Sequence, residues 1–355
     1  MIAKSIPFLL IGLLVFVCYL YFFVDISEMV AKIQHTNPFY YALAIIAFFL
    51  HIFFYALTWH YFLLPLSVKT SLKNTFLIVW VGAFVDILVP AESVSGDVSK
   101  AYLMSRGSKN TGRVVASLIS HRILSSVVTL GSLVIGSLSF LVLGHEIPGF
   151  ILNLILVVTF GSTIVLVFLF LLCFKQQITH RITDLLLRLG AFISRGRWKL
   201  TNLRSEARRI LKAFHQAIDI LGAHPMSLVP PVIFSITSWL FSLLISVLVF
   251  VSLGHPVSLR IIVTVYSISC AIQSIPLGIP ADIGVREPIM SGLYALLCSP
   301  SWAIPIKDAL NITFAATILI TILTIWLPLF IGFVATQWVG IKTLAGSSPN
   351  VPTEL

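Results

Sequence analysis

Long, uninterrupted runs of apolar residues alternate with short polar segments along most of the chain. Six runs are long enough to cross a bilayer, because about 20 apolar residues in a helix span its hydrocarbon core. The runs are continuous and do not alternate with a period of two, so the pattern predicts helices and not a membrane β-barrel. We therefore predict an all-α polytopic membrane protein with about six transmembrane helices, at 5–24, 38–64, 114–143, 150–174, 226–253 and 309–338.

Two further apolar runs stop before they are long enough to cross, and each is followed by a proline and charged residues. The first run ends at Pro90 and continues as PAESVSGDVSKAYLM, and the second ends at Pro280 and continues as PADIGVRE. Lipid cannot solvate a broken backbone, so such segments must be buried in protein or line a wet cavity. We predict two re-entrant helical hairpins, at about 75–105 and about 260–298, in preference to two ordinary polar loops.

The two predicted hairpins occupy matching positions in two halves of a single transmembrane domain, 1–355. Each half has the order span, span, hairpin, span, over about 5–143 and about 150–338. Interrupted segments in matching positions of two halves are typical of transporter binding sites. The predicted helix breaks use the same residue types in both halves and lie at Pro90, Gly96, Pro280 and Gly284.

The distribution of charge predicts the orientation of the chain. Charged residues make up only 10% of the sequence, against about 25% in soluble domains. When the segment 175–225 is placed in the cytoplasm, eighteen of the 23 Lys and Arg residues fall on that side, as the positive-inside rule requires. This distribution explains the net charge of +10 without nucleic acid. It predicts a protein of the cell (plasma) membrane with both termini in the cytoplasm, whose halves form an inverted repeat.

The basic segment 175–225 is the largest region outside the predicted spans. Its apolar residues recur at helical spacing over 178–193 and again over 203–221. Basic amphipathic helices bind anionic membrane surfaces through both their charge and their apolar face. We predict two such helices lying on anionic lipid, and a shorter surface helix over 26–33.

Charged residues gather at the two hairpins and at the start of the span after the first one. A charge at the bilayer centre costs at least about 2.5–3.5 kcal/mol, so such residues usually bind ligands or pair with one another. A helix that begins inside the membrane also offers free N–H groups and a positive dipole end to an anion. We predict that Arg122 and Arg286 hold a lipid phosphate. Asp97 and Glu287 are their predicted counter-charges, although purely structural ion pairs are the alternative. The full predicted substrate site contains Glu92, Asp97, Lys100, Arg122, Asp282, Arg286 and Glu287.

Other chemical signals in the sequence are weak. His51 and His60 lie within a predicted span, where each could be functional or simply hydrogen-bonded in the packing. The four cysteines have no metal-binding spacing, so we predict neither a metal site nor a cofactor. The chain also has no Walker motif, so direct ATP hydrolysis is not expected.

The hairpin sequences resemble those of the flippase-like membrane family, whose best-known member contains the transmembrane half of bacterial lysylphosphatidylglycerol synthase. The segments PAESVSGDVSKAYLM, SLISHR and IPADIGVRE carry this resemblance, which covers about residues 5–340. Positions that align with the residues of the family pattern are Pro90, Gly96, Asp97, Lys100 (a lysine in place of arginine), Ala101, Pro280, Gly284 and Glu287. Positions that depart from it are Lys100, where arginine is usual, the pair Ala281-Asp282, where two glycines are usual, and His121 and Ser125, where acids are usual.

The resemblance implies a transporter that binds a polar headgroup in a midplane cavity between the hairpins. Its partner would be a membrane phospholipid, a glycolipid or a lipid-linked glycan. The sequence contains no counterpart of the lysyl-transferring domain, so we expect transport and not aminoacyl transfer. One alternative is a membrane-embedded glycosyl- or phosphotransferase that acts on a polyprenyl-linked substrate, with a carboxylate as base. Another is a non-catalytic partner of such a glycosyltransferase.

Overall fold

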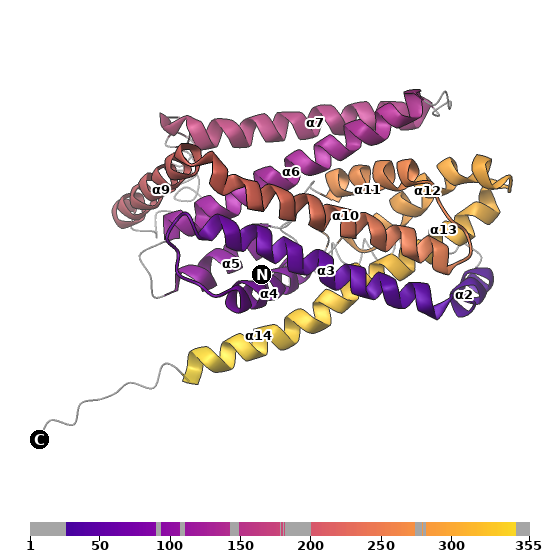
Figure 1. The fold of residues 1–355 in the computed structure, drawn as a ribbon, viewed down its shortest axis with the longest axis horizontal. Helices are drawn as coiled ribbons and strands as arrows, with labels where there is room; N and C mark the ends of the chain where they lie inside the picture. Colours follow the sequence, from indigo (N-terminus) through magenta and orange to yellow (C-terminus); the bar gives the residue numbers. More distant parts are fainter. Residues whose placement is uncertain are drawn as a thin grey trace, which may run out of the picture.

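A computed structural model describes residues 26–89, 94–106, 111–142, 149–177, 179, 181, 200–273, 279 and 282–345. Throughout these ranges the regular elements are helices, most of which run along the long axis of the molecule (Figure 1). The predicted span 5–24 lies outside the described residues. The other five predicted spans are confirmed by helices that are long and apolar enough to cross a membrane, over Pro38–Leu63, Thr111–Gly136, Leu152–Cys173, Pro225–Ser252 and Ile306–Trp338. The chain is an all-α polytopic membrane protein.

Helices α3 (Pro38–Leu63) and α10 (Val229–Ser252) lie side by side along the length of the bundle (Figure 1). Proline in the first turn suits both helix starts, where its missing N–H costs no hydrogen bond. The Asn37 side chain caps α3 by accepting from the N–H of Phe39. The backbone N–H of Asn37 also donates to the carbonyl of Ser252 at 2.7 Å, which fixes the start of α3 against the end of α10.

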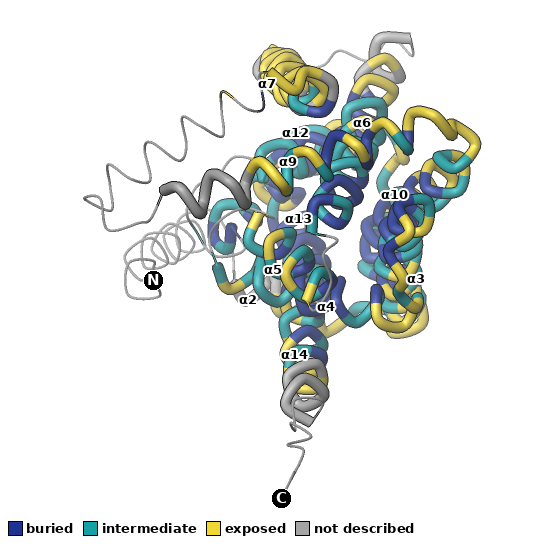
Figure 2. Tube along the Cα trace, turned by 90° about the vertical axis from the view of Figure 1, so that its left-hand side faces the viewer, coloured by how far each residue is buried: buried dark blue, intermediate teal, exposed yellow. Residues whose placement is uncertain are grey.

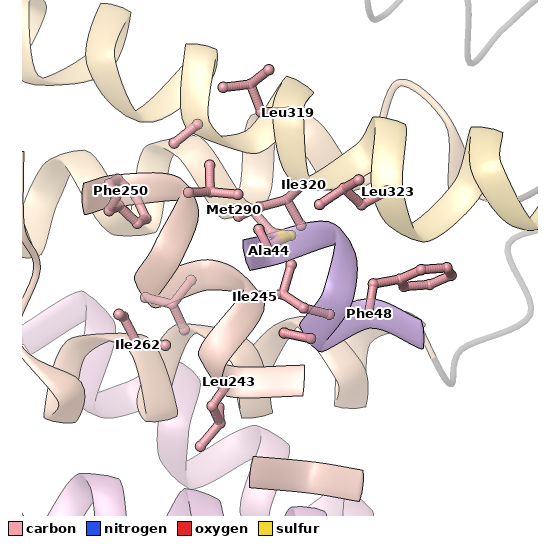
Figure 3. Close-up of a cluster of buried hydrophobic side chains, with 14 of the residues drawn as sticks. Ala44, Phe48, Leu243, Ile245, Phe250, Ile262, Met290, Leu319, Ile320 and Leu323 are labelled. Carbon is pink, nitrogen blue, oxygen red and sulfur yellow. The ribbon is translucent and has the colours of Figure 1, made fainter. Parts of the chain in front are cut away.

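Two clusters of buried apolar side chains hold the bundle together. The larger cluster joins α3 and α10 to the helices that follow α10, and Figure 3 shows Ala44 and Phe48 beside Ile245, Ile320 and Leu323. The second cluster joins the other end of α3 to the N-terminal part of the 111–142 helix. The small Ala44, which is fully buried, lets neighbouring helices approach closely.

Two pairs of short helices pack together in the positions of the predicted hairpins. The first hairpin consists of α4 (Leu72–Leu88) and α5 (Val94–Ser105), and the second consists of α11 (Leu259–Gln273) and α12 (Arg286–Trp302). These helices have 17, 12, 15 and 17 residues, each shorter than the roughly 20 residues that a full crossing needs.

The helix that follows each hairpin packs against the other hairpin. After the first hairpin, α6 (Thr111–Val142) packs on α11. After the second, α13 (Ile306–Thr321) continues through the π-helical segment η3 (Ile322–Trp326) into α14 (Leu327–Ala345), which packs on α4. The two hairpins are therefore connected through both of these long helices.

Helix α7 (Gly149–Phe174) has a different environment from the rest of the bundle. Its exposed side chains are apolar, including Leu156, Phe160 and Val165, and Figure 2 shows an almost continuously exposed helix. In its 22-residue apolar stretch, Leu152–Cys173, the most hydrophobic window has 0% of its residues buried. Such a surface is stable in lipid and not in water, which agrees with a membrane location.

The amphipathic helix predicted over 203–221 is present as α9 (Leu200–Ala223). Its apolar residues Phe214, Ile218 and Leu221 are buried against α6 and not left for lipid. Gly112 permits this contact, because a Cβ there would lie 2.6 Å from the carbonyl oxygen of Ile210. Most of the other predicted amphipathic helix, 178–193, lies outside the described residues. The predicted surface helix over 26–33 is present as α2 (Ile26–Gln34), at the opposite end of the bundle from α9 (Figure 1).

Candidate functional site

A cavity of about 320 Å³ lies between the two hairpins, α3 and the π-helical segment. Much of its wall is apolar and includes Phe48, Ile52 and Ile325. Ligand pockets commonly have this size and combine an apolar wall with a few polar groups. The polar and charged residues on the described wall are His51, Asp86, Gln273, Asp282, Arg286 and Thr324.

Asp86 connects the cavity to the second helix of the first hairpin. Its Oδ1 accepts hydrogen bonds from Ser95 Oγ at 2.9 Å and from the N–H of Gly96 at 2.6 Å. Its Oδ2 accepts no hydrogen bond from the described residues. Gly96 lies so close to α4 that a Cβ there would collide with the Asp86 carboxylate and stand 2.5 Å from the carbonyl oxygen of Gly82. Glycine is therefore required where α4 and α5 approach each other.

The second hairpin turns sharply just before α12. Asp282 and Gly284 both have left-handed backbone conformations, with φ of 51° and 88°. Only glycine adopts the φ of 88° without strain. The Glu287 carboxylate accepts from the N–H of Gly284 at 2.8 Å and from Thr321 Oγ1 at 3.2 Å, and this residue is 1% exposed. The predicted ion pair between Glu287 and Arg286 is therefore absent, because the carboxylate is turned back to hold the turn and α13.

Arg286, the first residue of α12, lines the cavity. Its Nε donates to the sulfur of Met290 at 3.5 Å. Within the described part of the chain, no carboxylate oxygen lies within 4.0 Å of the guanidinium, and its two terminal nitrogens make no hydrogen bond. A planar guanidinium with both terminal nitrogens available can bind a phosphate through two parallel hydrogen bonds.

Three of the predicted site residues form a separate cluster between α5 and α6. Asp97 pairs with Lys100 Nζ at 2.7 Å and with Arg122 Nη1 at 2.7 Å, as the counter-charge prediction for Asp97 requires. Lys100 is 4% exposed, and its ammonium lies 5.7 Å from the ring centre of Tyr55 and 6.0 Å from that of Trp59. These cation–π contacts stabilise the buried charge. None of Asp97, Lys100 and Arg122 is among the described residues that line the cavity.

Both histidines are hydrogen-bonded. His51 Nδ1 lies 2.9 Å from the carbonyl oxygen of Ser238 and 3.0 Å from its Oγ, while His60 Nδ1 lies 3.1 Å from Thr75 Oγ1. The packing interpretation therefore holds for both residues, although His51 also lines the cavity.

The predicted and observed sites overlap only in part. Of the predicted residues, Asp282 and Arg286 line the cavity. Asp86 and Gln273 were not among the predicted site residues, and His51 was singled out only as a histidine that could be functional. The available signal was that Asp86 and Gln273 are polar residues near the ends of the interrupted apolar runs. Three predicted positions, Pro90, Glu92 and Pro280, lie outside the described residues.

Long apolar spans and a helix that exposes apolar residues along its length define a multi-pass membrane protein. Residues 9–332 match the family described as the lysylphosphatidylglycerol synthase TM region, so the chain belongs to this family, as the hairpin sequences predicted.

Archaeal relatives resemble the chain over most of its length. A UPF0104 membrane protein of Pyrococcus horikoshii is 22% identical over 298 residues, which cover 82% of this chain and 84% of the relative. A UPF0104 membrane protein of Methanocaldococcus jannaschii is 22% identical over 339 residues, or 94% of each chain. No solved structure matches the sequence significantly.

Proposed function

We propose that this protein moves a polar-headed membrane lipid between the two leaflets, with the headgroup bound in the cavity between the hairpins. The observation that carries the proposal is that Asp86 of the first hairpin and Arg286 of the second face the same cavity of about 320 Å³. Charged groups inside a membrane are costly, and those that line a cavity usually mark the path of a polar ligand. The headgroup of a phospholipid, a glycolipid or a lipid-linked glycan would occupy the cavity while its chains stay in lipid.

Helix packing supports the predicted inverted repeat, an arrangement found in many transporters that work by alternating access. Exchanging α3 with α10, α4 with α11, α5 with α12, and α6 with the α13–α14 unit preserves the main contacts. The α6–α11 contact then corresponds to α14–α4, and α4–α5 corresponds to α11–α12. In this proposal the hairpins are re-entrant and enter from opposite sides of the cell membrane. Both termini and the segment 175–225 are cytoplasmic, where basic residues can meet anionic lipid.

Arg286 provides the direct test. The purified protein is reconstituted into liposomes, and the movement of fluorescent phospholipids between leaflets is measured. Arg286→Gln should slow transport about tenfold or more, because it removes a charge-assisted hydrogen bond to phosphate. Arg208→Gln, on the exposed surface of α9, is the matched control and should transport normally.

Wild-type transport by a folded Arg286→Gln variant would overturn the proposal. A turnover assay with nucleotide sugars and a polyprenyl phosphate acceptor separates transport from the transferase alternative. Product formation that depends on Asp86 would favour the enzyme, since a transporter leaves its lipid chemically unchanged.

A further inference from the structure

We infer that the cavity selects a zwitterionic phospholipid headgroup, in which Arg286 holds the phosphate and Asp86 holds a single positively charged amine. Asp86 would thereby be the specificity-determining residue. This inference rests on the proposed function and narrows its substrate to one chemical class.

The three charged side chains on the described cavity wall are not equally available to a ligand. Asp282 is 6% exposed and makes a further interaction within the protein. Among the described residues, Arg286 uses only Nε, toward Met290, and its terminal nitrogens make no hydrogen bond. Asp86 accepts hydrogen bonds from these residues only at Oδ1, while its Oδ2 lies beside Gly96 and accepts none. The described part of the cavity wall therefore offers a ligand one cationic and one anionic contact.

This pair of contacts discriminates between headgroups by charge. A headgroup that carries only a phosphate would neutralise Arg286 but would add a second negative charge beside the Asp86 carboxylate. A headgroup with excess positive charge would neutralise Asp86 but would leave a cation facing Arg286. Such mismatches are costly because the effective dielectric constant beside a protein wall is lower than that of bulk water. A headgroup with one phosphate and one amine places an opposite charge beside both Arg286 and Asp86.

The Asp86 carboxylate is held in place before any ligand arrives. Its two hydrogen bonds, from Ser95 Oγ and the N–H of Gly96, both end on Oδ1, so the orientation of Oδ2 is set by the first hairpin. Gly96 leaves the space that the carboxylate occupies. A carboxylate fixed in this way loses little freedom when it binds an amine, which favours selectivity. The phosphate contact comes from the other hairpin, so one headgroup would bridge both.

The test compares two phospholipids with the same labelled acyl chains, one with an ethanolamine and one with a glycerol headgroup. Wild-type protein in liposomes should move the ethanolamine lipid about tenfold faster, the ratio expected from one charge-assisted hydrogen bond. Asp86→Asn keeps an acceptor for Ser95 and Gly96, and it should reduce this ratio to about one. Asp219→Asn removes an exposed carboxylate on α9 and should preserve the ratio.

A second comparison changes the lipid instead of the protein. Acetylating the ethanolamine nitrogen removes its charge, so the wild-type protein should move the acetylated lipid about tenfold more slowly than the parent lipid. This comparison tests the role of the amine charge even where the Asp86→Asn variant does not fold. A ratio near one in wild-type protein, or one that persists in folded Asp86→Asn, would overturn the assignment of Asp86. Normal transport of both lipids by Arg286→Gln would instead overturn the proposed function.

Discussion

Two groups of charged residues lie within this bundle, and they are used in different ways. Asp97, Lys100 and Arg122 are joined to one another by ion pairs of 2.7 Å. Asp86 and Arg286 face a shared cavity, and neither forms an ion pair among the described residues. Charges that neutralise each other can fix two helices together, whereas charges that do not are available to a ligand. We therefore interpret the first group as a cluster that fixes α5 to α6 and the second as the candidate site, with Lys100 near enough to Asp86 for their charges to interact.

The sharpest test of this difference is the loss of Asp97. Asp97→Asn would leave Lys100, whose side chain is 6% exposed, and Arg122 without their shared carboxylate. Removing one partner of a buried ion pair costs about 3–5 kcal/mol. Because Asp97 and Arg122 are partly exposed, we expect a loss of about 3 kcal/mol in the free energy of unfolding. Denaturant unfolding in detergent measures it. A loss below about 1 kcal/mol would remove the distinction between the two groups.

The packing of the first hairpin gives the next largest expected effect. Gly96→Ala would place a methyl group against the Asp86 carboxylate and the Gly82 carbonyl oxygen. Overpacking of this kind costs about 1–3 kcal/mol, and displacement of Oδ2 should also reduce transport. Gly161→Ala is the matched control, because nothing lies within 4 Å of a Cβ at that position of α7. Equal stability of the two variants would contradict the close approach of α4 and α5.

Glu287 should behave as a structural residue with a smaller effect. Glu287→Gln retains one of the two side-chain oxygens. The amide can therefore accept from Gly284 or from Thr321, and more weakly than a carboxylate does. We expect a loss of about 1 kcal/mol, measured by thermal unfolding, with transport largely retained. Abolished transport in a fully stable Glu287→Gln protein would show that the carboxylate acts on the ligand after all.

Arg286→Gln should change stability least, by less than about 0.5 kcal/mol. The guanidinium has no ion-pair partner among the described residues, so its loss strands no carboxylate there. The cavity can hydrate the glutamine that replaces it. A destabilisation as large as that of Asp97→Asn would move Arg286 into the structural group.

Single-cysteine labelling tests the orientation of the bundle without disturbing either group. Gln216 on α9 and Ser258 after α10 are both exposed. The end of α10 is hydrogen-bonded to Asn37 at the start of α3, and α9 lies at the opposite end of the bundle from α2, which precedes α3 (Figure 1). In a background without other cysteines, Gln216→Cys should react from the cytoplasm and Ser258→Cys from outside the cell. Reaction of both from the same side would exclude the proposed orientation of the halves.

Local patterns in the sequence predicted the helices and part of the site. Apolar run length located the five described spans. The sequence predicts Glu287 as a counter-charge, but among the described residues it forms no ion pair with Arg286, since neighbouring residues on a helix point about 100° apart. The Glu287 side chain turns back to the N–H of Gly284 instead.

Contacts between distant segments were beyond local patterns. Asp86 and Gln273 reach the cavity only because α14 brings the first hairpin to one side of it and α6 brings the second to the other. The apolar face of α9 has the composition expected for a membrane contact, and only its packing on α6 shows that protein covers part of it. Neither the shared cavity nor the packing of α9 on α6 can be predicted from the pattern of residues along the chain.

The π-helical segment η3 divides the last span into two α-helical parts, α13 and α14. On one side of it, α13 packs on α12, and on the other, α14 packs on α4, so a single helix is fastened to both hairpins. The backbone hydrogen bonds of a π-helix join residues five apart, instead of four as in an α-helix. Pro328, just beyond η3, has no N–H to donate to the preceding turn. Thr324 and Ile325 of this π-helical segment also line the cavity. A bend at this segment would move α14 and the first hairpin relative to α13 and the second hairpin.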